Sequence, residues 1–173
     1  MIIETERLYF RELAETDDAA IFELDSDPEV HQYLGQHPIA SIADARHSIK
    51  LIRQQYIDNG IGRYAIIKKD SHNFVGWGAF KFITQPTNGH QFYHDLGYRL
   101  IKRYWGRGYA TESSRAAVDY AFKQLKLPAI YAIADVGNLQ SQKVLEKCGL
   151  VRNGVFDYDG VPHYWYEMNN PNV

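Results

Sequence analysis

RYWGRGYA, residues 103–110, is the stretch around which the predicted fold is organised. The residues before it, DLGYRLI at 95–101, are apolar enough to form a buried strand, and residues 111–125 carry apolar side chains at helical spacing. A strand therefore leads into a glycine-containing turn that opens a helix. Because the first amides of a helix lack an intrahelical acceptor and lie at the positive end of the helix dipole, such a turn can bind an anion.

The composition of this turn favours a phosphorylated ligand. Gly106 and Gly108 have no Cβ, so that a phosphate can approach the backbone closely, and Arg103 and Arg107 add positive charge. Two glycines near a helix start are also common where the turn needs only their conformational freedom. The stretch is not a Walker loop, since no Gly-Lys-Ser/Thr follows, and it lacks the third glycine of the dinucleotide fingerprint.

The composition of the whole chain is typical of a soluble globular protein. Its 173 residues are enough for one domain with a real core, and 45% of them are hydrophobic and 23% charged. The net charge of −2 gives no basic field for nucleic acid or membranes, and no apolar run reaches the roughly 18 residues of a membrane span. The N-terminal MIIE is too short and too acidic for a signal peptide, and the one cysteine excludes an internal disulfide and a cysteine-based metal cluster. We expect a single cytoplasmic domain over residues 1–173, without a metal.

The order of the predicted elements indicates a mixed-sheet α/β or α+β domain. Apolar alternation and helical periodicity give the order β-α-α-β-β-β-α-β-α-β-β. Thr16 is the expected N-cap of the first helix, Ser41 opens the second, and Gly76 and Gly78 indicate a bulge or a group close to the backbone. Strands are expected at 8–13, 63–68, 74–80, 92–101, 130–134, 151–156 and 163–168, and helices at 16–24, 29–34 (a short piece), 41–59, 111–125 and 138–147.

Three stretches together resemble the GNAT acetyltransferase family. RxxGxGxA at 103–110 resembles the family's acetyl-CoA pyrophosphate loop. NxxS at 138–141, followed by VLEKCGL at 144–150, resembles its second CoA motif. TERL at 5–8, with LGY at 96–98, resembles the ribosomal-protein-alanine acetyltransferase-like subgroup, which acetylates protein N-termini and has many small-molecule relatives. The resemblance spans essentially the whole chain.

This resemblance implies a mostly antiparallel central sheet that is splayed open like a V, with helices on both faces. The pantetheine arm of acetyl-CoA is then expected where the 95–101 strand parts from the 130–134 strand, and the pyrophosphate on the backbone amides of 106–110. The implied reaction is acetyl transfer from acetyl-CoA to an amine. The implied cofactor-binding residues are Leu100, Arg103, Gly106, Arg107, Gly108, Tyr109, Ala110, Asn138 and Ser141.

Acetyl transfer to an amine needs a base, because a free amine is mostly protonated at pH 7. Asp95, just upstream of the expected acetyl site, is the first candidate, although it could instead only solvate a strand end. His94, on the opposite face of a regular strand, and Glu167 are the alternatives. The oxyanion of the tetrahedral intermediate needs an N–H donor, which the resemblance implies to be the strand backbone near Tyr98 to Leu100.

The group that meets the leaving thiolate departs from the family's pattern. Many members place a tyrosine seven residues after the asparagine of the second motif, and here that position is Leu145, which cannot donate a proton. Ser141 lies one helical turn earlier on the same face and is expected to hydrogen-bond the sulfur or the pantetheine. Asn138 is expected to bind the pantetheine amides, and it is also a good N-cap. Cys148 is interpreted as a small buried apolar residue.

The acceptor is left open between a protein N-terminus and a small amine such as a polyamine, an amino acid or an antibiotic. A regulatory domain that binds CoA without turnover is the alternative from another class, favoured by Leu145 and opposed by Ser141. A phosphate-binding module of another fold is opposed by the second CoA motif. We expect the acceptor between the helices of residues 15–56 and the last hairpin, and a monomer or homodimer that binds neither nucleic acid nor membranes.

Overall fold

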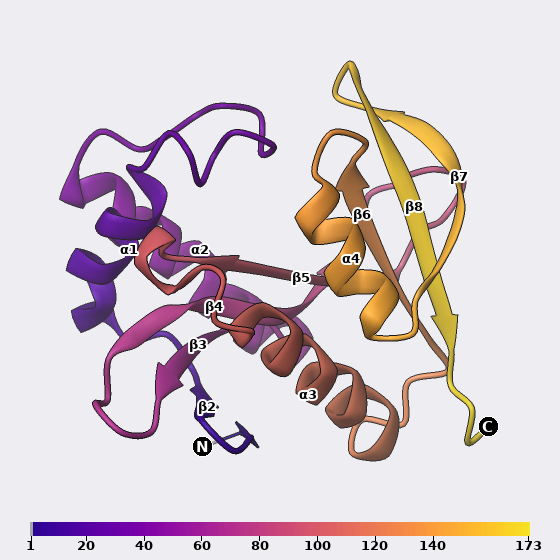
Figure 1. Cartoon of the computed structure of the whole chain (residues 1–173), viewed down its shortest axis with the longest axis horizontal. Coiled ribbons are helices and arrows are strands. Elements are labelled where there is room, and N and C mark those ends of the chain that lie inside the picture. The colour runs from indigo at the N-terminus through magenta and orange to yellow at the C-terminus, as the bar shows by residue number, and fades with distance from the viewer. Residues whose placement is uncertain (1) are drawn as a thin grey trace.

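The computed structural model describes residues 2–173 (Figure 1). The predicted order of elements is confirmed, and a short first strand that the sequence pattern did not indicate is added to it. In chain order the elements are β1 (Ile3–Glu4), β2 (Leu8–Arg11), the 3-10 helix η1 (Glu15–Asp17), α1 (Asp18–Asp25), α2 (Ile42–Asn59), β3 (Arg63–Lys68), β4 (Phe74–Ile83), β5 (Tyr93–Leu100), the 3-10 helix η2 (Lys102–Tyr104), α3 (Tyr109–Lys123), β6 (Ala129–Asp135), α4 (Leu139–Lys147), β7 (Val151–Tyr158) and β8 (Val161–Asn169).

The strands form one sheet in the order β1-β2-β3-β4-β5-β6-β8-β7. Neighbouring strands are antiparallel except for β5 and β6, which are parallel. In the described chain a single residue pair, Asp95 and Tyr131, joins β5 to β6, although the strands continue to Leu100 and Asp135. Beyond this pair the two halves of the sheet diverge, and Figure 1 shows β6 and β8 steeply inclined to β5. The expected V-shaped mixed sheet is confirmed, and we call the region beyond this pair the parting.

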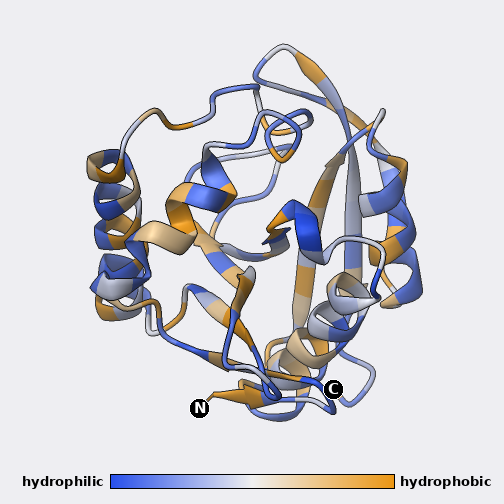
Figure 2. Ribbon diagram, turned by 60° about the vertical axis from the view of Figure 1, so that its left-hand side comes forward, coloured by the Kyte–Doolittle hydropathy of each residue, from blue (hydrophilic) through white to orange (hydrophobic). Residues whose placement is uncertain are grey.

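Helices cover both faces of the sheet, and they lie on either side of the strands in Figure 2. α1 and α2 pack against each other and against β4, α3 packs across β4 and β5, and α4 packs on α3, β6 and β7. Successive side chains of β5 point to opposite faces. Arg99 reaches Asp25 at the end of α1, whereas its neighbour Tyr98 contacts Ser141 of α4. We call these two sides of the sheet the α1 face and the α4 face.

The strands that carry the site are held in a closely packed core. β3 is buried from Arg63 to Ile67, and β4 is buried at most positions up to Phe80. Each fully buried large apolar side chain stabilises the fold by about 1.5–3 kcal/mol, so β3 and β4 form a well-packed base beside β5. Among residues 2–173, no helix has both the length and the apolar character needed to cross a membrane.

The first helix begins later than the sequence predicts. Thr16, the expected N-cap, lies inside η1, and α1 begins only at Asp18. The carboxylate of Asp17 accepts hydrogen bonds from the Ala14 amide (2.8 Å) and from the Arg11 guanidinium (2.7 and 2.8 Å). These bonds hold the chain in an additional 3-10 turn before the helix.

The segment between the first two long helices also differs from its prediction. The short helix expected at 29–34 is wrong, because these residues form turns; one or two helical turns cannot offset the cost of nucleating a helix. The second helix follows its prediction. Ser41 accepts a hydrogen bond from the Asp44 amide, and Gly60 ends the helix with a φ of 68°.

Gly76 and Gly78 allow close packing around β4. A Cβ at Gly76 would lie 2.1 Å from the carbonyl oxygen of Arg99, and one at Gly78 would lie 3.0 Å from the Ile66 Cδ1 atom. The register of β3 with β4 shifts between Ile66 and Ile67, next to the Ile66–Gly76 pair, so the expected bulge is confirmed, and the group close to the backbone is the neighbouring protein itself.

Candidate active site

The turn between β5 and α3 has the geometry of an anion-binding loop. Gly106 and Gly108 have φ angles of 71° and 80°, and Gly108 directly precedes α3. These angles favour glycine, so the conformational explanation of the two glycines is correct. A Cβ at Gly106 would meet no atom within 4 Å, so its backbone is also accessible to a ligand. Glycine therefore both shapes the turn and leaves the start of the helix open.

The two arginines of this loop differ in their surroundings. Arg103 forms an ion pair with Glu23 of α1, and its Cζ lies 4.9 Å from the centre of the Tyr104 ring. Arg107 is exposed, and its carbonyl oxygen accepts a hydrogen bond from Arg7 (3.0 Å). Arg103 has to exchange Glu23 for a phosphate before it can bind one.

The N-terminal segment is bonded to the first turn of α3. One carboxylate oxygen of Glu112 accepts from the Thr5 hydroxyl (2.6 Å) and the Arg7 amide (3.0 Å), and the other accepts from the Arg7 Nε (2.6 Å). Burial alone raises the pKa of Glu112, but the bonds from Thr5 and Arg7 outweigh it and lower that pKa. The TERL motif contributed only to the subgroup resemblance, and no sequence signal indicates a contact over 105 residues.

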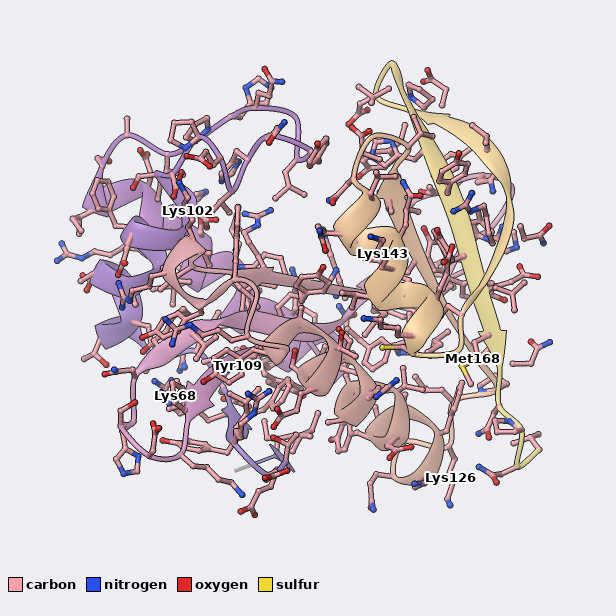
Figure 3. The ribbon with its side chains drawn as sticks, in the orientation of Figure 1. Lys68, Lys102, Tyr109, Lys126, Lys143 and Met168 are labelled. Atoms are coloured by element: carbon pink, nitrogen blue, oxygen red, sulfur yellow. The ribbon has the colours of Figure 1, made fainter. Side chains whose placement is uncertain are left out.

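Further basic side chains surround the loop and the parting. Lys68 lies near Tyr109, and Figure 3 shows the two side chains close together at the start of α3. The same view shows Lys102 of η2 and Lys143 of α4 on the two sides of the parting. Both lysines are exposed, and Lys102 is paired with Glu29. A polyanion that crosses this surface would meet positive charge from both halves of the sheet.

Tyr98, Ser141 and Cys148 come together on the α4 face. Asn138 caps α4, because its Oδ1 accepts from the Ser141 amide (3.2 Å). The Ser141 hydroxyl lies beside that of Tyr98, and burial raises the pKa of Tyr98 to about 12, so the phenol stays protonated at neutral pH. The sequence assigned only backbone chemistry to Tyr98, and its meeting with Ser141 depends on the position of α4.

The other two residues of this motif pack into the core. Leu145, which stands where many members of the family have a tyrosine, is buried. Cys148 is buried as predicted, and burial raises the pKa of its thiol to about 11. A thiol with that pKa is almost entirely protonated at pH 7, which does not suit a nucleophile.

The backbone of β5 presents amides to the parting. Ile101 donates its N–H to the Val75 carbonyl of β4 (2.9 Å). Because hydrogen-bonded pairs alternate along antiparallel strands, the amides of Leu100 and Tyr98 point away from β4. The Leu100 carbonyl also points away, since it accepts from the Trp105 indole (2.9 Å). These amides face the side on which β6 has diverged.

Asp95 lies on the α1 face in a buried ion pair. Its Oδ2 is 2.7 Å from the Arg63 Nη2, and only 15% of its side chain is exposed. Burial raises the pKa of Asp95, while the Arg63 guanidinium acts against that rise. Gly97 makes room for the pair, because a Cβ there would lie 2.7 Å from the Arg63 Nη2. No sequence signal linked Arg63 to this site.

The two alternative bases have other surroundings. His94 lies on the opposite face, as predicted, with its ring 5.0 Å from that of Phe82, and burial lowers its pKa. Glu167 accepts a hydrogen bond from the Asn153 amide group (3.0 Å). Of the three candidates, only Asp95 is on β5 and on the α1 face.

A second arginine extends the charged cluster on the α1 face. Arg99 is paired with Asp25 (2.7 Å), and its Cζ lies 4.8 Å from the centre of the Trp77 ring. Its Nε and both ring nitrogens of His31 are buried without a hydrogen-bond partner among the described residues. Burial lowers the pKa of His31, and Arg99 adds to that effect, so the imidazole is neutral at pH 7.

Aromatic rings line the other side of the parting on the α1 face. Tyr131 of β6 lies 5.5 Å from Trp165 of β8 and 5.3 Å from Tyr93 of β5, measured between ring centres. Because Tyr131 is paired with Asp95, these rings stand on the same face as the carboxylate. The α1 face of the parting is therefore bounded by charged groups on β5 and by rings on β6 and β8.

Comparison with known sequences agrees with this arrangement. Residues 7–151 match the family model described as "Acetyltransferase (GNAT) domain". The "Uncharacterized N-acetyltransferase p20" of Bacillus licheniformis is 31% identical over 156 residues, which cover 90% of this chain and 85% of that protein.

Solved structures share the whole fold. An acetyltransferase of the GNAT family from Bacillus anthracis superimposes with a TM-score of 0.81 at 26% identity, over 98% of this chain and 99% of that one. Spermidine N-acetyltransferase from Vibrio cholerae in complex with CoA and spermine has a TM-score of 0.76 at 20% identity, over 96% of this chain and 97% of that one. Ribosomal-protein-S5-alanine acetyltransferase from Vibrio fischeri also has a TM-score of 0.76 at 20% identity, over 98% of this chain and 96% of that one. At this identity the last two establish the fold alone.

Proposed function

The chain belongs to the GNAT acetyltransferase family and is an N-acetyltransferase, and we propose that it moves the acetyl group of acetyl-CoA to a primary amine by direct attack at the parting. The observation that carries this proposal is the single pairing of Asp95 with Tyr131. Beyond it β5 offers backbone amides with no partner strand, beside a loop whose glycine backbone is accessible. A thioester can lie in the parting while its diphosphate binds the loop.

The positions of the loop and of α4 support an approach of acetyl-CoA from the α4 face. The amides of Gly106–Ala110 would bind the pyrophosphate at the start of α3, with Arg107 exposed beside them. Asn138 and Ser141 would hold the pantetheine arm from α4. The acetyl group then points through the parting toward the α1 face, where the amine attacks.

The amides of Tyr98 and Leu100 are suited to stabilise the oxyanion. Their orientation away from β4 directs them at the carbonyl of a thioester that lies along β5. A fixed backbone donor of this kind needs no reorganisation when charge develops, and removal of one such donor typically costs on the order of 10²–10³ in kcat.

Two hydroxyls are suited to meet the leaving thiolate. Ser141 and Tyr98 stand together on the face from which the pantetheine enters. Tyr98 comes from β5 rather than from α4, and we propose that this pair takes the place of the tyrosine that Leu145 replaces. The protonated phenol is the donor, and Ser141 orients it or bonds the sulfur directly.

Asp95 is the base that we propose. It lies on the face from which the amine attacks. Burial raises the pKa of Asp95, which makes the carboxylate a stronger base, and the Arg63 guanidinium limits that rise. A carboxylate so placed can attract a cationic amine and accept its proton, directly or through one water molecule.

A protein N-terminal amine is the acceptor class that we propose, in line with the TERL and LGY resemblance. The charges on the α1 face support it over a polyamine. The guanidinium groups of Arg63 and Arg99 balance the carboxylates of Asp95 and Asp25, whereas a polyamine requires an excess of carboxylates. Carbonyl oxygens of a peptide are compatible with such a balanced surface.

The test measures turnover of acetyl-CoA with a panel of amines. Turnover is monitored as the release of free thiol. The panel holds a short peptide with a free N-terminus, the same peptide with a blocked N-terminus, a free amino acid and spermidine. We expect thiol release with the free peptide and none with the blocked one. CoA binding without release for any amine would instead identify a regulatory domain, and release with spermidine alone would replace the proposed acceptor class.

A further inference from the structure

We propose that Arg7 is a positioning residue of the pyrophosphate loop, which holds the loop in place and cancels the charge of Glu112. This inference rests on the proposed use of acetyl-CoA, and it assigns a role to the N-terminal segment, which lies outside both CoA motifs. Arg7 and Glu112 are 105 residues apart in the sequence, and the contact between them joins the start of the chain to the loop that follows β5.

Arg7 contacts the loop at two places and lies beside a third. Its Nη1 donates to the carbonyl oxygen of Arg107 (3.0 Å), and its guanidinium carbon lies 4.5 Å from the centre of the Tyr109 ring. Its Nη2 would lie 3.3 Å from a Cβ at Gly108, so any side chain there would crowd the guanidinium. One planar guanidinium therefore contacts Arg107 and Tyr109, the residues on either side of Gly108. The amides expected to bind the pyrophosphate belong to this same short segment.

Glu112 creates the need for this arrangement. Its amide donates to the Gly108 carbonyl (3.0 Å), so the carboxylate stands one helical turn after the loop. A carboxylate in the first turn stabilises the helix, but a free one would repel a diphosphate at the same helix start. In the structure both oxygens of Glu112 are bonded, to Thr5 and to Arg7.

The ion pair of Arg7 with Glu112 removes this repulsion of the diphosphate. The Nη2 and Nε of Arg7 both lie 2.6 Å from the Glu112 Oε2, so a full positive charge stands directly against the carboxylate. The Arg7 side chain remains 43% exposed, whereas that of Glu112 is 19% exposed. The arginine is thus the more accessible of the two charges, and with the carboxylate neutralised the helix start keeps its attraction for an anion.

The experiment compares CoA with pantetheine, which lacks the diphosphate and the adenosine. Dissociation constants for both are measured by calorimetry on the wild type, Arg7→Met, Glu112→Gln and the double variant Arg7→Met/Glu112→Gln. Arg46→Met is the matched control, because Arg46 forms an equally short exposed pair with Asp18 (2.7 Å) on the other helices. Thermal unfolding confirms that each variant is folded, and Arg7→Lys serves as a conservative variant.

We expect Arg7→Met to weaken CoA about tenfold, as a nearby uncompensated charge at intermediate dielectric would, and to leave pantetheine unchanged. Glu112→Gln should bind CoA at least as well as the wild type. The double variant should recover most of the loss, and Arg7→Lys should fall between the wild type and Arg7→Met. A purely structural role would weaken both ligands together and would not be relieved by the second substitution.

Three results would overturn the inference: unchanged CoA affinity in Arg7→Met, an equal loss for pantetheine, or a double variant as weak as Arg7→Met. These differ from a failure of the proposed function, in which the wild type itself binds CoA no better than pantetheine. A loss of CoA affinity in Arg46→Met equal to that in Arg7→Met would likewise contradict a local role for Arg7.

Discussion

The two faces of the sheet at the parting are built by different means. The α4 face offers backbone amides, two glycines with positive φ and the hydroxyls of Ser141 and Tyr98. The α1 face offers charged side chains held in pairs, Arg63 with Asp95 and Arg99 with Asp25. The first face suits a ligand that is the same for every member of the family, and the second suits one that varies.

This difference has a physical origin. A backbone site needs only a strand, a turn and a helix in succession, so it survives large changes of side chains elsewhere. A site made of buried ion pairs fixes each charge in one geometry, because a buried charge without its partner is strongly unfavourable. We therefore expect substitutions on the two faces to separate, with acetyl-CoA affinity controlled from the α4 face and acceptor use from the α1 face.

The largest effect is expected for Asp95→Asn, which keeps the shape of the side chain and removes its charge. If Asp95 is the base, kcat/KM should fall on the order of 10²–10⁴-fold at neutral pH. Raising the pH deprotonates the amine without help, so the activity of the variant should partly recover there. The measurement is kcat/KM against pH with one amine for the variant and the wild type.

Arg63→Met is the matched control for this substitution, because it breaks the same ion pair and keeps the carboxylate. An equal loss in both variants, with unchanged pH profiles, would mean that the pair has a structural role. Overlaying profiles for Asp95→Asn and the wild type would remove Asp95 from the chemistry and turn attention to Glu167, His94 or an ordered water molecule.

Gly108→Val should have the next largest effect, and it tests the α4 face. Gly108 has a φ of 80°, which a β-branched residue adopts at a cost of roughly 1–3 kcal/mol. The new side chain would also crowd Arg7 and the approach of the phosphate. Affinity for CoA, measured by calorimetry, should fall about 10- to 100-fold by the same energies, with the fold retained. Wild-type affinity in the variant would show that the loop serves only as a turn.

A smaller effect is expected for Ser141→Ala, which should lower turnover more than acetyl-CoA affinity. A hydrogen bond that strengthens as charge develops on the sulfur contributes more in the transition state than in the ground state. The loss in kcat should be about tenfold, in the range of one hydrogen bond to a charged group. Tyr98→Phe should give a loss of similar size if the two hydroxyls act together, and the double variant should then add little. A rise in KM for acetyl-CoA with kcat unchanged would leave Ser141 a binding role only.

The sequence predicted one of these faces much better than the other. The glycine loop, the Asn138 cap with Ser141 and the splayed sheet follow from local patterns and from the family resemblance, and the fold is confirmed. The ion pair of Arg63 with Asp95 and the bonds of Arg7 to Glu112 join residues that are 32 and 105 positions apart. Such contacts are fixed by how strands and helices pack, which no local pattern records. The late start of α1 has a local cause instead, since the bonds of the Asp17 carboxylate to Arg11 and Ala14 replace the expected Thr16 cap.

The smallest effect concerns the long-range pair of Arg7 with Glu112 on the α4 side, and it tests whether that side is truly independent of charge. The pKa of Glu112 lies below its ordinary value of 4.5 in the folded protein, with the hydrogen bonds from Thr5 and Arg7 outweighing burial. A group whose pKa is lowered by folding contributes stability that is fully present above about pH 4.5 and is lost as the pH falls through the folded pKa. The glutamine of Glu112→Gln does not titrate, so the stability deficit of this variant relative to the wild type should be constant from neutral pH down to about pH 4.5 and should shrink below it.

Urea unfolding of both proteins at a series of pH values measures this difference, and the same comparison in an Arg7→Met background should give a smaller change. A deficit that stays the same at every pH would mean that the carboxylate charge contributes nothing to the contact between Arg7 and Glu112. The α4 side would then depend on backbone geometry alone.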